Sequence, residues 1–112
     1  MKAQRLTGKA LQKAIIDLAH THGYRVAHFA SVPITRRGKT FYATPVEADG
    51  IGWPDLFLVR DRRALAIEVK GDGDRLRDEQ QEWLGALVRA GIEAYVVTAK
   101  DWRDGRLDAL LT

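Results

Sequence analysis

The chain has 112 residues, a formal net charge of +3 and no cysteine. This length predicts one domain, residues 1–112, and the absence of cysteine excludes disulfides and thiolate metal sites and favours an intracellular location. The apolar runs fall well short of the ~18 residues that cross a bilayer, so we expect no membrane span and no secretory signal.

The charge is unevenly distributed along the chain. Residues 1–50 carry eight Lys and Arg against three Asp and Glu, whereas residues 51–112 carry ten against twelve. A basic half beside an acidic half is typical of a nucleic-acid enzyme that holds a cation. An ordinary solvated surface explains the same net charge, so this pattern alone leaves both interpretations open.

The N-terminal segment predicts a helix from Thr7, a suitable cap, to about residue 22, and Gly23 ends it. Its apolar stripe consists of Leu11, Ala14, Ile15, Leu18 and Ala19. Gln12 lies at the edge of this stripe. Lys9 and Lys13 lie on the outer side, where simple solvation and contact with a phosphate backbone both fit the pattern.

Residues 24–29 predict a strand. His28 lies within it, and we interpret this lone histidine as a packed, hydrogen-bonded residue rather than a metal ligand. Residues 30–51 show no regular pattern, which is typical of a functional or mobile segment.

The irregular segment is basic and aromatic. Arg36, Arg37 and Lys39 form its basic tip, which is compatible with phosphate contact or with a solvated turn. Phe41 and Tyr42 could stack on an unpaired base, but we expect them to pack into the core.

Two strands follow, at residues 56–60 and 64–70, joined by the polar break Asp61-Arg62-Arg63. The first strand is apolar on both faces, so we expect helices on both sides of the sheet. Gly52-Trp53-Pro54-Asp55 precedes it, and Pro54 is tolerable there because the missing N–H need not interrupt the ladder.

Charged side chains interrupt the second of these strands. Side chains alternate along a strand, so Glu68 and Lys70 share one face while Val69 points to the other. Asp55 reaches the same end of the sheet if the two strands form a hairpin. Buried charge is costly unless it is paired or metal-bound, so the three residues predict either a metal site or a structural ion-pair cluster.

The C-terminal third predicts a helix from about residue 77 to 90, a strand at residues 92–98, and a final helix capped by Asp101. Gln80 falls on the apolar stripe of the first helix, so its amide needs hydrogen-bond partners, either at a site or on the backbone. The order is therefore helix, strand, long loop, strand, strand, helix, strand, helix.

Pro54-Asp55 followed by Glu68-Val69-Lys70 resembles the signature of the PD-(D/E)XK nuclease superfamily. The wider pattern is similar to the VRR-NUC branch, from about Leu11 to Trp102; it consists of Gly52-Trp53-Pro54-Asp55, Glu68-Val69-Lys70-Gly71, Leu76, Gln80, Trp83-Leu84 and Leu87. This resemblance implies an α/β protein with a restriction-endonuclease-like αβββαβ core, in which helices flank a central mixed sheet.

The resemblance also implies a metal-dependent DNA endonuclease. Mg²⁺ or Mn²⁺ prefers oxygen ligands, so we expect Asp55, Glu68 and the backbone carbonyl of Val69 to hold the ion. Lys70 would orient the attacking water and oppose developing negative charge. Gln80 would orient water or substrate.

One position departs from the family. Its members usually carry a glutamate one turn before the glutamine at Gln12, and here Gly8 stands at that position. Gln12 or a water could fill the accessory place. The departure keeps a catalytically inactive nucleic-acid-binding module as the alternative function.

Small stand-alone members of the family act as dimers on branched DNA such as Holliday junctions. The resemblance therefore implies a homodimer that cuts branched DNA, located in the cytoplasm, or in the host cytoplasm if a phage encodes the chain. A domain of a phage or mobile-element complex that mediates only protein contacts is a further alternative.

Overall fold

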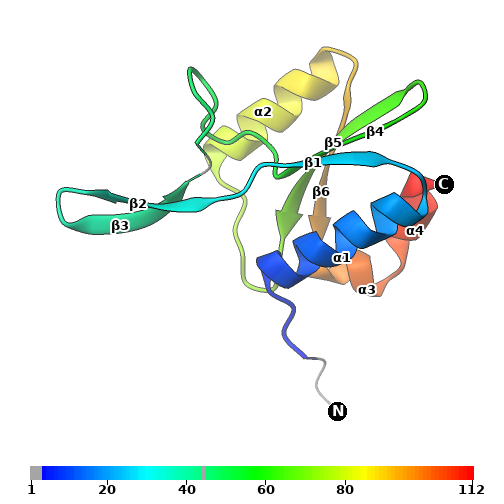
Figure 1. The fold of residues 1–112 in the computed structure, drawn as a ribbon, viewed down its shortest axis with the longest axis horizontal. Helices are drawn as coiled ribbons and strands as arrows, with labels where there is room; N and C mark the ends of the chain where they lie inside the picture. The colour runs from blue at the N-terminus through cyan, green and yellow to red at the C-terminus, as the bar shows by residue number, and fades with distance from the viewer. Residues whose placement is uncertain (1–3, 44) are drawn as a thin grey trace.

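Within residues 4–43 and 45–112, which the computed structural model describes, four strands form the central sheet (Figure 1). They are β1 (Arg25–His28), β4 (Leu56–Arg60), β5 (Arg63–Lys70) and β6 (Glu93–Thr98), in the spatial order β1-β4-β5-β6. The pairs β1–β4 and β4–β5 are antiparallel, and β5–β6 is parallel. The sheet is therefore mixed, as predicted, and β5 occupies an interior position.

Helices lie on both faces of this sheet (Figure 1). One face is covered by α1 (Gly8–Thr21), α3 (Ala99–Arg103) and α4 (Arg106–Leu111), and the other by α2 (Asp78–Arg89). The core lies on the first face and includes Leu11, Ile15, Leu56, Leu58, Leu65, Ile67, Val69, Val97, Leu107 and Leu111. Glu68 points to the second face, since its neighbours along β5 fill the core.

The ends of α1 follow the prediction. The Thr7 hydroxyl oxygen accepts a hydrogen bond from the backbone N–H of Ala10 at 3.2 Å. After the helix, Gly23 has a φ of +85°, the left-handed conformation that terminates helices.

The prediction of an irregular segment at residues 30–51 was wrong in part. Within it, β2 (Val32–Arg36) and β3 (Lys39–Ala43) form an antiparallel hairpin, a two-stranded sheet separate from the central one. Arg37 and Gly38 both have positive φ, as a two-residue hairpin turn of type I′ requires. Arginine rarely adopts this conformation, so the sequence carries only half of the usual turn signal.

The expected burial of two aromatic residues was also wrong. Phe41 is 44% exposed and Tyr42 is 68% exposed. Both belong to the hairpin, which extends away from the central sheet in Figure 1, so the core does not reach them.

The C-terminal helix begins earlier than predicted and is interrupted. Thr98 is the N-cap of α3, and Asp101 is the third helical residue, whose carboxylate accepts from the Thr98 backbone N–H at 2.9 Å. Gly105, with a φ of +72°, then separates α3 from α4. Asp101 thus takes part in the cap without being the capping residue.

Candidate active site

Asp55 lies immediately before β4 and is hydrogen-bonded to β5 and to the residue that follows β1. Its Oδ2 accepts a hydrogen bond from the backbone N–H of Val69 at 2.8 Å, and its backbone carbonyl accepts from Phe29 N–H at 2.8 Å. The register Leu56↔Ile67 places Asp55 one step beyond the β4–β5 ladder, beside Glu68. The hairpin predicted from the sequence is confirmed, and it brings the two carboxylates to one end of the sheet.

Glu68 is the buried centre of the cluster, with 1% of its surface exposed. Its Oε1 accepts from Gln80 Nε2 at 2.9 Å and lies 3.4 Å from Lys70 Nζ. Its Oε2 is buried and has no hydrogen-bond partner among the residues that the structure describes. A buried carboxylate oxygen without a hydrogen-bond partner is costly in a folded protein, so this atom is suited to bind a cation.

The pKa of Glu68 also indicates that the negative charge of the cluster is not balanced. Burial, the largest cause, and the nearby charge of Asp55 together raise the pKa of Glu68 to about 8, although Lys70 opposes this rise. Within the described chain the cluster thus sets two carboxylates against one neighbouring ammonium. The arrangement favours an additional positive charge at Glu68.

Gln80 is buried on α2, as the sequence indicated, with 6% of its surface exposed. Its Oε1 accepts from the backbone N–H of Arg77 at 2.9 Å, which caps the first turn of the helix, while Nε2 donates to Glu68. Both ends of the amide are therefore engaged. The observed contacts position Glu68; a contact of Gln80 with water or substrate stays a prediction.

Two glycines permit the close packing around the cluster. A Cβ atom at Gly52, whose φ is +89°, would lie 2.5 Å from the backbone of Glu79. A Cβ at Gly71 would lie 2.3 Å from the backbone nitrogen of Gly8. The loop before Asp55 is thus in direct contact with α2, and the turn after Lys70 is in direct contact with the start of α1.

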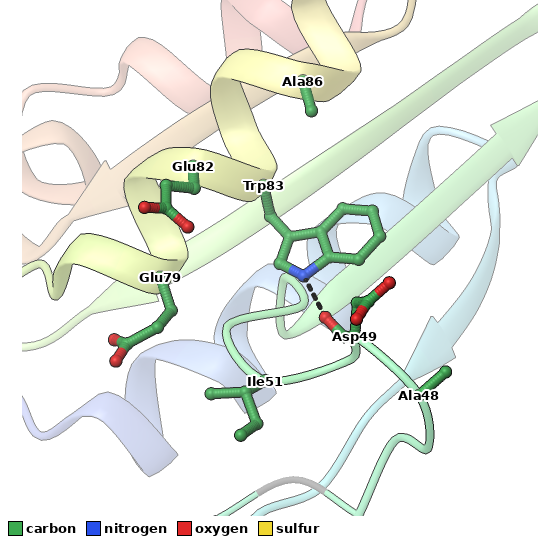
Figure 2. Close-up of a pocket in the computed structure, with 7 residues that line it drawn as sticks. All are labelled: Ala48, Asp49, Ile51, Glu79, Glu82, Trp83 and Ala86. Atoms are coloured by element: carbon green, nitrogen blue, oxygen red, sulfur yellow. Dashed lines mark hydrogen bonds between the residues drawn. The ribbon is translucent and has the colours of Figure 1, made fainter.

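The loop before Asp55 has a second attachment to α2. Trp83 Nε1 donates to the backbone carbonyl of Asp49 at 2.9 Å (Figure 2). Glu79, Glu82 and Ile51 line a cavity of about 460 Å³ around this bond. The ring of Trp53 packs edge-on against Trp83, with centroids 5.0 Å apart, so the tryptophan of the motif helps to fix the loop.

A cavity of about 820 Å³ opens onto the carboxylates. The residues predicted from the sequence that line it are Lys9, Gln12, Asp55, Glu68, Val69, Lys70 and Gln80. Lys13 lies outside this cavity, 3.4 Å from Asp17, and the basic tip Arg36, Arg37 and Lys39 belongs to the hairpin. The structure therefore gathers the proposed chemistry in one place and spreads the proposed DNA contacts over a wider surface.

The sequence reasoning did not place several other residues that line the cavity: His28, Ser31, Tyr42, Asp74 and Arg77. His28 Nε2 is 2.9 Å from Gln12 Oε1, which fits the expected hydrogen-bonded histidine, but the side chain is exposed rather than packed. Only the register β1–β4, which sets His28 opposite Leu56, could have indicated its place near Asp55.

Gly8, which stands where the resembled family has a glutamate, lies close to Asp74. A Cβ atom at Gly8 would lie 3.0 Å from Asp74 Oδ2, which accepts from the Gly71 backbone N–H at 2.8 Å. A carboxylate from the β5–α2 turn thus lies beside the position where the resembled family has its glutamate.

The carboxylates of the cluster fit a hard divalent cation, since Asp55 and Glu68 line one cavity and one Glu68 oxygen has no partner among the described residues. Among the described residues, no three His, Cys, Asp or Glu side chains gather closely enough to hold a metal by themselves. Asp55 and Glu68 would therefore need further ligands, and a contribution of the Val69 carbonyl stays a prediction.

Comparison with known families decides the classification. The sequence model of the VRR-NUC domain matches residues 39–101, which include Asp55, Glu68, Lys70 and Gln80. The chain belongs to the VRR-NUC domain family. The core α1-β1-β4-β5-α2-β6 of this VRR-NUC domain is the restriction-endonuclease-like αβββαβ arrangement expected from the sequence, with the β2–β3 hairpin inserted between β1 and β4.

A curated relative carries the same kind of domain. A Fanconi-associated nuclease 1 homolog of Caenorhabditis elegans is 45% identical over 47 residues, which is 40% of this chain and 5% of the relative. The VRR-NUC chain therefore spans only a small part of that protein. No solved structure matches the chain. Within the described ranges, every helix is too short or too polar to traverse a bilayer.

Proposed function

We propose that this VRR-NUC domain is a metal-dependent DNA endonuclease. The observation that carries the proposal is the Glu68 carboxylate, buried at the end of a strand with Oε2 unpartnered among the described residues, at the inner end of a large cavity. Asp55 and Lys70 flank it. Perturbed carboxylates in a cavity are typical of catalytic sites, and a purely structural ion pair would leave no buried oxygen without a partner.

Asp55, Glu68 and the carbonyl of Val69 would hold Mg²⁺ or Mn²⁺. A divalent ion bound there would supply a more acidic water and neutralise charge on the phosphate. Gln80 orients Glu68 by a hydrogen bond, and the Val69 backbone N–H orients Asp55.

Lys70 supports the proposal by its position. Its side chain is 13% exposed, and Nζ lies 3.4 Å from Glu68 Oε1 at the inner end of the cavity. A partly desolvated ammonium there opposes negative charge that develops on the scissile phosphate and orients the attacking water by hydrogen bonding. It does so more strongly than in bulk water, because the surroundings are less polarisable.

The substrate in this proposal is DNA, and branched DNA in particular. Lys9 lines the cavity, Lys13 lies on the next turn of α1, and Arg36, Arg37 and Lys39 extend the positive surface along the hairpin. Phosphate contacts of this kind give affinity without sequence specificity. A homodimer would place two such cavities on one junction, which two symmetric cuts require. The location proposed for this activity is the cytoplasm, or the host cytoplasm for a phage protein.

The test is a panel of four-way, flap and linear DNA incubated with Mg²⁺, Mn²⁺ or EDTA. Wild type should nick in either metal and not in EDTA, whereas Glu68→Ala and Lys70→Ala should bind the same DNA without cutting it. Lys100→Ala is the matched control, because Lys100 is 76% exposed and paired with Asp104 on α3. Metal-independent cutting, or equal cutting by Glu68→Ala, would contradict the proposal.

Gly8 supports a second candidate, a nucleic-acid-binding module without turnover. Position 8 itself lacks the glutamate that the resembled family usually carries there, although Asp74 lies beside it. This alternative predicts DNA binding that EDTA does not change and no product from any substrate in the panel.

A further inference from the structure

The β2–β3 hairpin is a basic and aromatic arm attached to the active-site cavity. Residues 32–43 contain three Arg and Lys and no Asp or Glu. Within the described chain the hairpin pairs only with itself and is separate from the central sheet. An isolated two-stranded hairpin is marginally stable in water, so a bound ligand would stabilise this arm.

The register divides the side chains of the hairpin between two faces. Tyr42 is opposite Pro33, and Thr40 is opposite Thr35, with the two threonine hydroxyls 2.9 Å apart. These four residues share one face, since directly paired residues and alternate residues point the same way. Phe41 lies on the other face with Ile34, which is half-buried.

Tyr42 connects this first face to the catalytic cluster. Its ring is 68% exposed, yet it lines the same 820 Å³ cavity as Asp55, Glu68 and Lys70. An exposed aromatic ring at the mouth of a cavity, with lysines and arginines on either side, is the arrangement that binds single-stranded nucleic acid. The ring can stack on a base, and the basic side chains can contact phosphates.

We propose that Tyr42 stacks on an unpaired base next to the scissile phosphate, and that the tip of the hairpin holds phosphates further along the same strand. Tyr42 and Lys39 are three positions apart along β3, or ~10 Å at ~3.3 Å per residue. This reach extends beyond the stacked base to neighbouring phosphates of the same strand. The inference rests on the proposed endonuclease function and specifies its substrate class.

That class is DNA with an unpaired nucleotide beside the cleaved bond, as at a fork, a flap or an open junction. In continuous duplex the base is already stacked on its neighbours, and extracting it costs free energy that the tyrosine must recover. An unpaired base carries no such cost. Stacking also tolerates any base, so Tyr42 would select structure rather than sequence.

The test measures binding by the full chain in EDTA, where metal-dependent cutting is suppressed. The probes are a fork with a short single-stranded arm and a blunt duplex of equal length, each labelled for fluorescence anisotropy. Tyr42→Ala should weaken fork binding by about 10- to 100-fold and leave duplex binding unchanged within about twofold. Tyr42→Phe and Tyr42→Trp should retain fork binding, because both keep an aromatic ring.

A 2-aminopurine in the arm reports stacking directly. Its fluorescence should fall on addition of wild type, Tyr42→Phe or Tyr42→Trp, and stay constant with Tyr42→Ala. Phe41→Ala is the matched control, since Phe41 is an exposed aromatic residue on the opposite face of the same hairpin. Equal fork binding by wild type and Tyr42→Ala would overturn the inference, as would equal losses on fork and duplex.

The same samples separate this inference from the proposed function. Addition of Mn²⁺ after the binding measurement shows whether wild type cuts. If Tyr42→Ala weakens fork binding but wild type does not cut, the stacking role of Tyr42 stands and the endonuclease proposal is overturned. If wild type cuts but Tyr42→Ala binds the fork normally, the endonuclease proposal stands and the stacking role is overturned. A change of mass in sedimentation for Tyr42→Ala, with unchanged DNA affinity, would identify the arm as a contact between copies and overturn the inference.

Discussion

Gln80 Nε2 donates a hydrogen bond to Glu68 Oε1 at 2.9 Å, and the same amide caps α2 by accepting from the Arg77 backbone N–H. One side chain therefore joins the start of a helix to a buried carboxylate on the central strand. Because both the oxygen and the nitrogen of the Gln80 amide are hydrogen-bonded, Glu68 has little freedom to turn away from Asp55. The orientation of the carboxylate is a property of the sheet and the helix together.

Truncation of this side chain should affect catalysis more than folding. Gln80→Ala removes the donor to Glu68 and the acceptor for the cap, so we expect the cutting rate to fall about 10- to 100-fold, as for partners that orient metal ligands. The loss of the cap should cost about 1 kcal/mol of unfolding free energy. Nicking assays and urea unfolding measure both effects. Gln81→Ala, at the exposed neighbouring position, is the control. Equal cutting rates for the two variants would contradict a positioning role.

Divalent metal should stabilise the protein through Glu68. Mn²⁺ at about 100 times its Kd should add ~2.7 kcal/mol to the free energy of unfolding of wild type and raise its Tm. Glu68→Gln keeps the shape of the side chain and removes a charged ligand, so its Tm should be the same in Mn²⁺ and EDTA. Glu82→Gln is the control, because Glu82 lines the separate cavity beside Trp83. An equal rise of Tm in Glu68→Gln would place the metal elsewhere.

Replacement of Gly52 should destabilise the fold by steric conflict, whereas replacement of Gly91 should not cause such a conflict. Gly52 and Gly91 have nearly the same φ, +89° and +87°. A Cβ at Gly52 would meet the Glu79 backbone, whereas at Gly91 it would meet no described atom within 4 Å beyond its neighbours. Gly91→Ala should therefore cost only the backbone strain, about 1 kcal/mol, and Gly52→Ala about 3 kcal/mol or more. Urea unfolding compares the two. Equal losses would mean that contact with α2 contributes nothing at position 52.

Acid should weaken an ion pair at the opposite end of the sheet from the cavity. The hydrogen bond from Arg63 is the largest influence on Glu93 and, with a second from Tyr95, lowers the pKa of Glu93 from 4.5 to about 2. A lowered pKa stabilises the fold at pH values above the unfolded value of 4.5, and this contribution is lost as pH falls from there toward 2. Glu93→Gln should therefore lower Tm at pH 7 and show a smaller decrease of Tm between pH 5 and pH 3 than wild type. Asp17→Asn, on the exposed side of α1, should follow wild type. A wild-type pH dependence in Glu93→Gln would show that the pair does not stabilise the fold.

The sequence by itself determined the parts of this protein that depend on local periodicity. The alternation along β5 separates Glu68 and Lys70 from the core residues Ile67 and Val69, and this follows from the geometry of any strand. The short polar turn between β4 and β5 then brings Asp55 to the same end of the sheet. The apolar stripes of α1 and α2 and the cap at Thr7 belong to the same class of local signal.

The tertiary structure decided what lies beside these elements. The Arg37-Gly38 turn, the exposed Tyr42 at the cavity, the bond from His28 to Gln12 and the approach of Asp74 to Gly8 are not encoded in any periodic pattern. Each depends on contacts between residues distant in the chain, or on a backbone conformation that its residue seldom adopts. A strand pattern states which face a side chain occupies, but only the packing of α1, α2 and the hairpin around the sheet determines which atoms it meets there.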